Sequence, residues 1–142
     1  MSPEFASPEV QAFANGFPIA LLHAVVTIVL LLLGALAHGL LSPYREVQHI
    51  REGNTAAALS FGGVLIGLAL PLSRSLSASA SVIETAIWGI AVTVVLLLFF
   101  RIVDMALKGL PQRVQEGEIS AATLLVAAKL AVAIVVAAAV SG

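Results

Sequence analysis

The stretch 52–67, EGNTAAALSFGGVLIG, decides the fold of this chain. It opens with a charged, glycine-containing turn and continues as an uncharged run rich in alanine and glycine. A similar stretch returns in the second half of the chain, where 116–131 reads EGEISAATLLVAAKLA. Each copy lies between two long apolar segments. The repetition therefore predicts a two-helix membrane hairpin that is used twice.

The composition around these copies is that of a protein surrounded by lipid. Of the 142 residues, 60% are hydrophobic and 11% are charged, whereas soluble domains carry about a quarter charged residues. The formal net charge of −1 gives no reason to expect nucleic acid as a partner. The chain has no cysteine, which excludes disulfides and thiolate metal sites.

A helix needs roughly 20 apolar residues to cross a bilayer, and several segments of the chain meet this requirement. The predicted spans are 17–41, 55–72, 82–108 and 119–140. We therefore predict an all-α integral membrane protein with four transmembrane helices in two hairpins, residues 17–78 and 79–142, preceded by a polar N-terminal arm at 1–16. Pro71 lies near the end of the second span and is expected to terminate that helix.

The basic residues of the loops predict how the chain crosses the membrane. Arg45 and Arg51 lie between the first two spans, and Arg113 lies between the last two. The middle loop holds only Arg74, and the two ends of the chain hold neither lysine nor arginine. By the positive-inside rule the two basic loops are cytoplasmic, which puts both termini outside. Two hairpins of the same topology are parallel repeats, related by an axis along the membrane normal.

A family resemblance rests on residues 44–73, YREVQHIREGNTAAALSFGGVLIGLALPLS. This stretch resembles the YjfL-like domain of unknown function 350, a family of small bacterial inner-membrane proteins that looks like a duplicated two-helix unit. The residues that carry the resemblance are Glu52, Gly53, Asn54, Ala56, Ala57, Gly62, Gly63 and Gly67. The second copy is less similar, because Glu118 replaces the expected asparagine. The resemblance implies four spans and a bacterial inner membrane, and it carries over no activity.

The turns of the two copies are predicted to start their helices. Glu52, Gly53 and Asn54 form the loop and helix-start signature of the first copy, and Glu116 and Gly117 are its counterpart in the second. Asparagine is a favoured N-cap residue, so Asn54 is expected to cap the helix that follows it.

Small residues at a spacing of four predict tight helix contacts. The pair Gly63 and Gly67 matches the pair Ala127 and Ala131, and Gly62 widens the smooth face of the first copy. Such pairs let helix backbones approach closely in lipid, where no hydrophobic force draws helices together. The alternative is that these faces line a pathway with exposed backbone.

Lys129 is the charge that the sequence places deepest in a span. It lies about ten residues into the last predicted helix, or about 15 Å at the rise of an α-helix. A lysine at that depth costs about 2.5 to 3.5 kcal/mol on insertion scales, so it normally has a partner or a water-filled cavity. It points away from the face shared by Ala127 and Ala131. Three readings stay open: an internal salt bridge, a contact with headgroups or another protomer, and a transport or proton-coupling role.

Arg101 and Asp104 are three residues apart and therefore share a face of the third predicted span. We predict a buried charge cluster of Arg101, Asp104 and Lys129 between the third and fourth helices. His38 lies close to the level of Asp104, and histidine can relay protons. It is thus a candidate for a proton or polar relay, and no metal-ligand spacing accompanies it.

The sequence supports two classes of function. It contains no nucleophile–base set and no phosphate-binding loop, so we expect neither an enzyme nor a cofactor. The first candidate is a channel- or transporter-like bundle, which needs a homo-oligomer because four spans enclose little space. The second is a non-transporting structural subunit that binds lipid and another membrane subunit. A hydrated cavity around Lys129 would favour the first, and a dry lysine–aspartate pair would favour the second.

Overall fold

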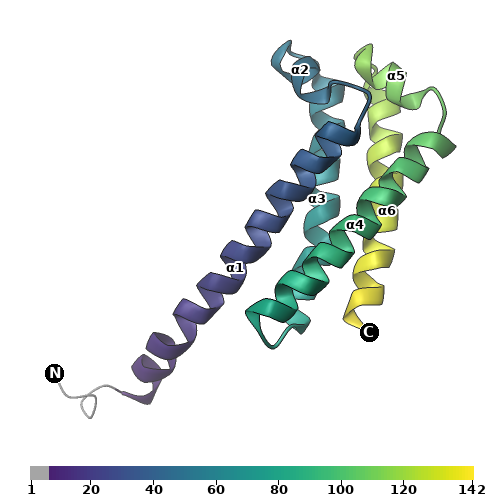
Figure 1. Ribbon diagram of the computed structural model, residues 1–142. Coiled ribbons are helices and arrows are strands. Elements are labelled where there is room, and N and C mark those ends of the chain that lie inside the picture. Colours follow the sequence, from purple (N-terminus) through teal and green to yellow (C-terminus); the bar gives the residue numbers. More distant parts are fainter. Residues whose placement is uncertain (1–6) are drawn as a thin grey trace.

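The computed structural model describes residues 7–142, and this part of the chain is helical without strands. Its helices are α1 (Pro8–Leu41), α2 (Glu46–Arg51), α3 (Thr55–Ala78), α4 (Val82–Ala106), α5 (Leu110–Gln115) and α6 (Ile119–Ser141). Four of them, α1, α3, α4 and α6, are long and apolar enough to cross a membrane. The all-α, four-span class is therefore confirmed. The short helices α2 and α5, which were not predicted, both lie at the same end of the bundle (Figure 1).

Two helices extend beyond their predicted bounds. The first begins at Pro8 and not at residue 17, because Ser7 caps it and Pro8 fits the first turn. Residues 8–16 of the predicted arm are thus helical, and residues 1–6 lie outside the described part of the chain. The expectation that Pro71 ends a helix is wrong, since α3 continues through it to Ala78. Neighbouring helices allow an internal proline of this kind in membrane bundles.

The other two long helices differ from prediction by one or two residues at their C-terminal ends. Helix α4 ends at Ala106 and α6 ends at Ser141, where residues 108 and 140 were expected. Differences of this size are normal at helix ends, which fray and often tighten in the last turn.

The turns that close α2 and α5 have the same backbone structure at matching positions of the two copies. The amide of Glu52 donates to the carbonyl of Gln48, and the amide of Glu116 donates to the carbonyl of Gln112. The glycines that follow, Gly53 and Gly117, have φ angles of +87° and +88°. Glycine adopts this left-handed region without the steric cost that other residues meet. Each turn then delivers the chain into a long helix.

Helix α3 is the centre of the bundle. It contacts α1, α4 and α6, and it is the most buried of the long helices. In Figure 1 it stands between α1 on one side and α6 on the other. The main apolar core lies around it and consists of Ala35, Val64, Leu68, Leu96, Phe100 and Ala133. A second core at the loop end consists of Ala56, Ala57, Val114, Ala121, Ala122 and Leu125.

Helix α1 joins this bundle only from His23 onward, where the Nδ1 atom of the imidazole lies 3.1 Å from the hydroxyl oxygen of Thr85 on α4. Residues 8–22 are all exposed, and Figure 1 shows that this part of α1 leans away from the other helices. The buried residues of α1 are Gly34, Ala35 and His38. The most buried part of α1 is therefore the part close to the loop end, where the polar residues described below gather.

Gly63 and Gly67 lie where α3 meets its neighbours closely. A Cβ atom added to Gly63 would lie 2.7 Å from the nearer methyl group of Val126 on α6. A Cβ atom on Gly67 would lie 2.7 Å from Cζ of Phe100 on α4. Gly62 differs, because an added Cβ would meet nothing within 4 Å, so its predicted packing role is corrected.

The predicted packing face of α6 also requires a correction. Ala127 and Ala131 are exposed, whereas Leu125, Lys129 and Ala133 are buried. Helix α6 thus turns its lysine-bearing side toward the bundle and its matched alanines toward lipid. The central α3 buries several sides, but α6 lies at the edge of the bundle and needs only one buried stripe. A match in sequence between the two helices therefore does not imply a match in the buried face.

Candidate functional site

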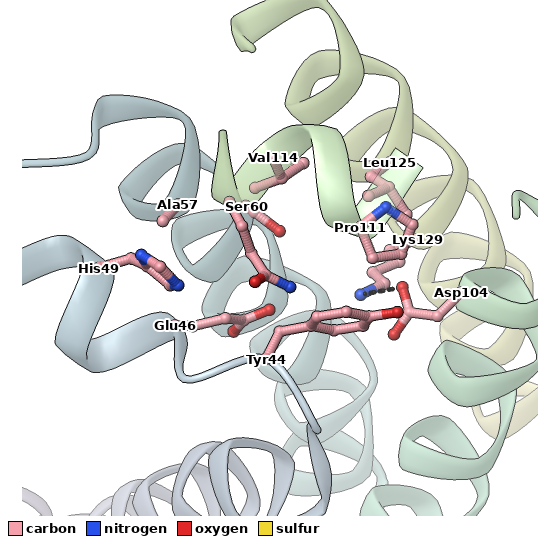
Figure 2. Close-up of a pocket in the computed structure, with 11 residues that line it drawn as sticks. Tyr44, Glu46, His49, Ala57, Ser60, Asp104, Pro111, Val114, Leu125 and Lys129 are labelled. Atoms are coloured by element: carbon pink, nitrogen blue, oxygen red, sulfur yellow. Dashed lines mark ion pairs between the residues drawn. The ribbon is translucent and has the colours of Figure 1, made fainter. Parts of the chain in front are cut away.

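A polar pocket lies at the loop end of the bundle, beneath α2 and α5. Its titratable side chains are Tyr44, Glu46, His49, Asp104 and Lys129, which come from both halves of the chain (Figure 2). The pocket is small: the volume open to the centre of a water-sized sphere is about 10 Å³. This is roughly the space that a single water molecule needs.

Lys129 and Asp104 form an ion pair at one side of this pocket. Nζ of Lys129 on α6 lies 2.9 Å from Oδ1 of Asp104 on α4, and the two side chains are 2% and 11% exposed. In Figure 2 the hydroxyl end of Tyr44 points toward the same carboxylate. The ammonium also lies 5.7 Å from the ring centroid of Phe100, within the range of a cation–π contact. The deep lysine that the sequence singled out is thus neutralised inside the chain.

The structure does not bring Arg101 into this cluster as the sequence predicted. Within residues 7–142, no carboxylate forms an ion pair with Arg101 or with Lys108. Arg101 instead lines a neighbouring groove together with Lys108. Asp104 lines both the pocket and this groove, but only Lys129 lies within ion-pair distance of it, so the predicted triad is a pair.

His38 contacts a second buried carboxylate. Its Nε2 atom lies 3.4 Å from Oε2 of Glu46, and the two side chains are 4% and 12% exposed. The two atoms are within ion-pair distance but are not aligned as a hydrogen bond, and neither has another hydrogen-bond partner among residues 7–142. The imidazole meets the ring of Phe100 edge-on, with centroids 6.4 Å apart. Phe100 therefore contacts both His38 and Lys129.

Glu46 and Phe100 belong to this site, and sequence reasoning missed both. Glu46 lies in the segment between the first two predicted spans, for which only the basic residues were considered, and in the structure it lies at the start of α2 and meets His38 at the end of α1. Phe100 was one of many apolar residues in its span. The useful signal was a carboxylate placed just beyond a helix that ends with a histidine in its last turn.

Asn54 connects the two halves of the chain above the pocket. Its Oδ1 atom accepts a hydrogen bond of 3.0 Å from the amide of Ala57, which caps α3 as predicted from the sequence. Its Nδ2 atom donates to the carbonyls of Val114 at 3.2 Å and Gln115 at 2.8 Å. These two residues end α5, so the signature asparagine of the first copy fixes the loop of the second.

The equivalent position of the second copy works differently. Glu118 makes no side-chain cap for α6 and instead accepts a hydrogen bond of 2.6 Å from Nε of Arg113. The hydrogen bond from Arg113 lowers the pKa of Glu118 below its ordinary value, and a hydrogen bond from Ser120 adds to this effect. Glu52 and Glu116 are exposed, and their amides close the turns described above.

The fold and this site define a small multi-pass helical membrane protein with paired charges at one end of its bundle. The sequence model of the Domain of Unknown Function (DUF350) family matches residues 12–140, and the chain belongs to this family. It is 32% identical over 91 residues to the UPF0719 inner membrane protein YjfL of Escherichia coli strain K12, covering 64% of this chain and 69% of that protein. The protein of that name in strain O157:H7 matches equally well. No solved structure matches the chain significantly.

These comparisons establish the location of the protein. It is a multi-pass protein of the bacterial inner membrane, in line with the relatives' name and with the spans found in the structure. The family description names no activity, so the role of the polar pocket has to be argued from its geometry.

Proposed function

We propose that the protein is a non-transporting structural subunit of the inner membrane, which binds a partner through its loop end. The observation that carries this proposal is the ion pair between Lys129 and Asp104, in a pocket of about 10 Å³. That space holds roughly one water molecule, whereas a transport route has to accommodate its substrate or a chain of waters. The proposal assigns no catalysis to the pocket.

The surroundings of the pocket support the same role. On its membrane side lies the apolar core around Phe100, with Val64, Leu68 and Leu96 fully buried. A buried ion pair adds little stability in itself, but removing one partner leaves an unpaired charge and costs about 3 to 5 kcal/mol. The pair therefore fixes how α4 and α6 meet. Asn54 joins the turn after α2 to the end of α5, and we assign the partner to the surface formed by these two short helices.

We also propose that the two hairpins arose by duplication and that α2 and α5 lie on the cytoplasmic side of the membrane. The turns after α2 and α5 share their hydrogen bonds position for position, which supports duplication of a hairpin. The basic loops between the spans support a cytoplasmic position for α2 and α5. Both termini then lie on the other side of the membrane, and the binding platform faces the cytoplasm.

A channel- or transporter-like homo-oligomer is the second candidate. The observation in its favour is the exposed face of α6, where Ala127 and Ala131 would let two copies approach closely. An assembly of this kind could enclose a space that a single chain lacks. In this candidate His38 and Glu46 would serve as a relay beside the pore.

Flux across proteoliposomes distinguishes the two candidates. Wild-type protein, Lys129→Met and the matched surface variant Lys108→Met are reconstituted, and the movement of protons, potassium and chloride is followed with dyes. We expect all three to match protein-free vesicles. A flux that wild type and Lys108→Met support and Lys129→Met abolishes would refute the structural role. Native mass spectrometry of the same samples gives the oligomeric state.

A further inference from the structure

A basic groove lies beside the polar pocket, at the level where the spans end. Its walls are the connection from α1 to α2, with Pro43 and Tyr44, and the end of α4 with Arg101 and Lys108. The groove has a volume of about 400 Å³, far more than the neighbouring pocket. It is large enough for a headgroup and not only for water.

The groove carries two cations that the protein does not neutralise. Arg101 lies in the last part of α4, Lys108 lies in the turn two residues after the helix ends at Ala106, and both line the groove. Neither forms an ion pair with any acidic residue in 7–142. Asp104 also lines the groove, but it is already paired with Lys129. These four groups, three positive and one negative, leave a local charge of +2.

The groove lies at the boundary between apolar and polar surroundings. Arg101 is five residues before the end of α4 at Ala106, or about 7.5 Å along the helix. Its long side chain can reach the plane of the phosphates while its stem stays in hydrocarbon. Met105 lines the same groove and is 56% exposed, so an apolar contact adjoins the cations. This combination suits a molecule with an anionic head and an acyl tail.

The first half of the chain has a groove in the corresponding place, lined by a single cation, Arg45, with the acidic Glu46 beside it. It has a volume of about 450 Å³ and is lined by Leu40, Val47 and Gln48, the counterparts of Asp104, Pro111 and Gln112. At the positions of the first copy that match Arg101 and Lys108, the chain has Ala37 and Tyr44. The groove therefore forms without the two cations, so they are not needed to build it.

We propose that Arg101 and Lys108 bind the headgroup of an anionic phospholipid in the groove of the second half, a headgroup whose phosphate charge is not neutralised by a choline. Guanidinium and ammonium groups at the end of membrane helices attract anionic headgroups, and each contributes about a fivefold gain in binding. The acyl chains then lie against Met105 and the end of α4. This inference holds whether or not the protein transports anything.

Binding of short-chain lipids to the full chain in neutral detergent tests the proposal. Wild type is titrated with dioctanoyl phosphatidylglycerol and dioctanoyl phosphatidylcholine, and binding is read by native mass spectrometry. We expect roughly a 25-fold preference for phosphatidylglycerol, the product of the two fivefold gains. The variant Arg101→Gln/Lys108→Gln should lose this preference. The matched variant Arg45→Gln/Arg51→Gln, which loses two cations from the first loop, should keep it.

Two further measurements complete the test. The first distinguishes a lipid headgroup from a free phosphate, and the second distinguishes a lost binding site from a misfolded protein. Inorganic phosphate and glycerol 3-phosphate are offered as competitors, and either one displacing the lipid at equal concentration would overturn the assignment to a lipid. The swapped variant Arg101→Lys/Lys108→Arg keeps both charges and should keep the preference even if the glutamine variant is unstable. The proposal is overturned if wild type binds both lipids alike, or if the first-loop variant loses the preference equally.

Discussion

Asn54 makes the link between the two halves of the chain, and its replacement gives a graded prediction. Asn54→Ser keeps a good N-cap residue but removes the amide that donates to Val114 and Gln115. Asn54→Ala removes these donors and the cap to Ala57 as well. The difference between the two variants separates the contact between halves from the local capping of α3.

The magnitudes follow from the hydrogen-bond lengths. The bond to Gln115, at 2.8 Å, has a normal length and contributes about 1 kcal/mol net. The bond to Val114, at 3.2 Å, lies at the long end of the usual range, and we assign it about 0.5 kcal/mol. The cap contributes about 1 kcal/mol. Asn54→Ser should therefore lower the free energy of unfolding by about 1.5 kcal/mol and Asn54→Ala by about 2.5 kcal/mol.

Reversible unfolding in mixed micelles, followed by circular dichroism as dodecyl sulfate is added, measures these values. The neighbouring exposed variant Thr55→Ala serves as the control and should change stability by less than about 0.5 kcal/mol. The reasoning is refuted if Asn54→Ser is as stable as wild type, because the contacts with α5 would then contribute nothing. Equal losses for serine and alanine would assign the whole effect to α5 and none to the cap.

The remaining predictions concern packing, pH and orientation. Gly63→Ala should lose about 1 to 3 kcal/mol of stability through overpacking, because its Cβ would lie 2.7 Å from a methyl group of Val126. Gly62→Ala has open space and should lose none. Equal losses of the two variants in the same unfolding assay would contradict this prediction. Wild type should be more stable than Glu118→Gln at neutral pH, because Arg113 lowers the pKa of Glu118 in the folded protein. This difference in stability should fade as the pH falls below the ordinary pKa of 4.5. A difference that grows on acidification would contradict the prediction. Because the chain has no cysteine, single Glu52→Cys and Ser141→Cys variants should react with an impermeant maleimide from the cytoplasmic and the periplasmic side respectively, and the reverse pattern would invert the orientation.

The four spans were predictable because lipid imposes a simple rule on composition and length. Long apolar runs have to become helices when no water can satisfy their backbone. The rule does not locate a helix start in polar sequence, so the helical segment that α1 adds before residue 17 escaped it. It also does not distinguish a proline that ends a helix from Pro71, which sits inside one.

The site was predictable only at Lys129, where a charge deep in a membrane span needs an oppositely charged partner. Lys129 is too deep to remain alone, and Asp104 was the acid within its reach. Glu46 could not be placed in the same way, because its position depends on how α2 folds over the end of α1. The exposed position of Ala127 was equally hidden, since alanine fits both a helix contact and a lipid-facing surface.

A double-mutant cycle on Lys129 and Asp104 tests the central claim that these charges form a closed structural pair. Lys129→Met and Asp104→Asn should each cost about 3 to 5 kcal/mol, because each leaves an unpaired buried group. The double variant should cost at least about 2 kcal/mol less than the sum of the two single losses, as expected for residues in direct contact. Additive losses, or a Lys129→Met variant as stable as wild type beside a weakened Asp104→Asn, would contradict the account.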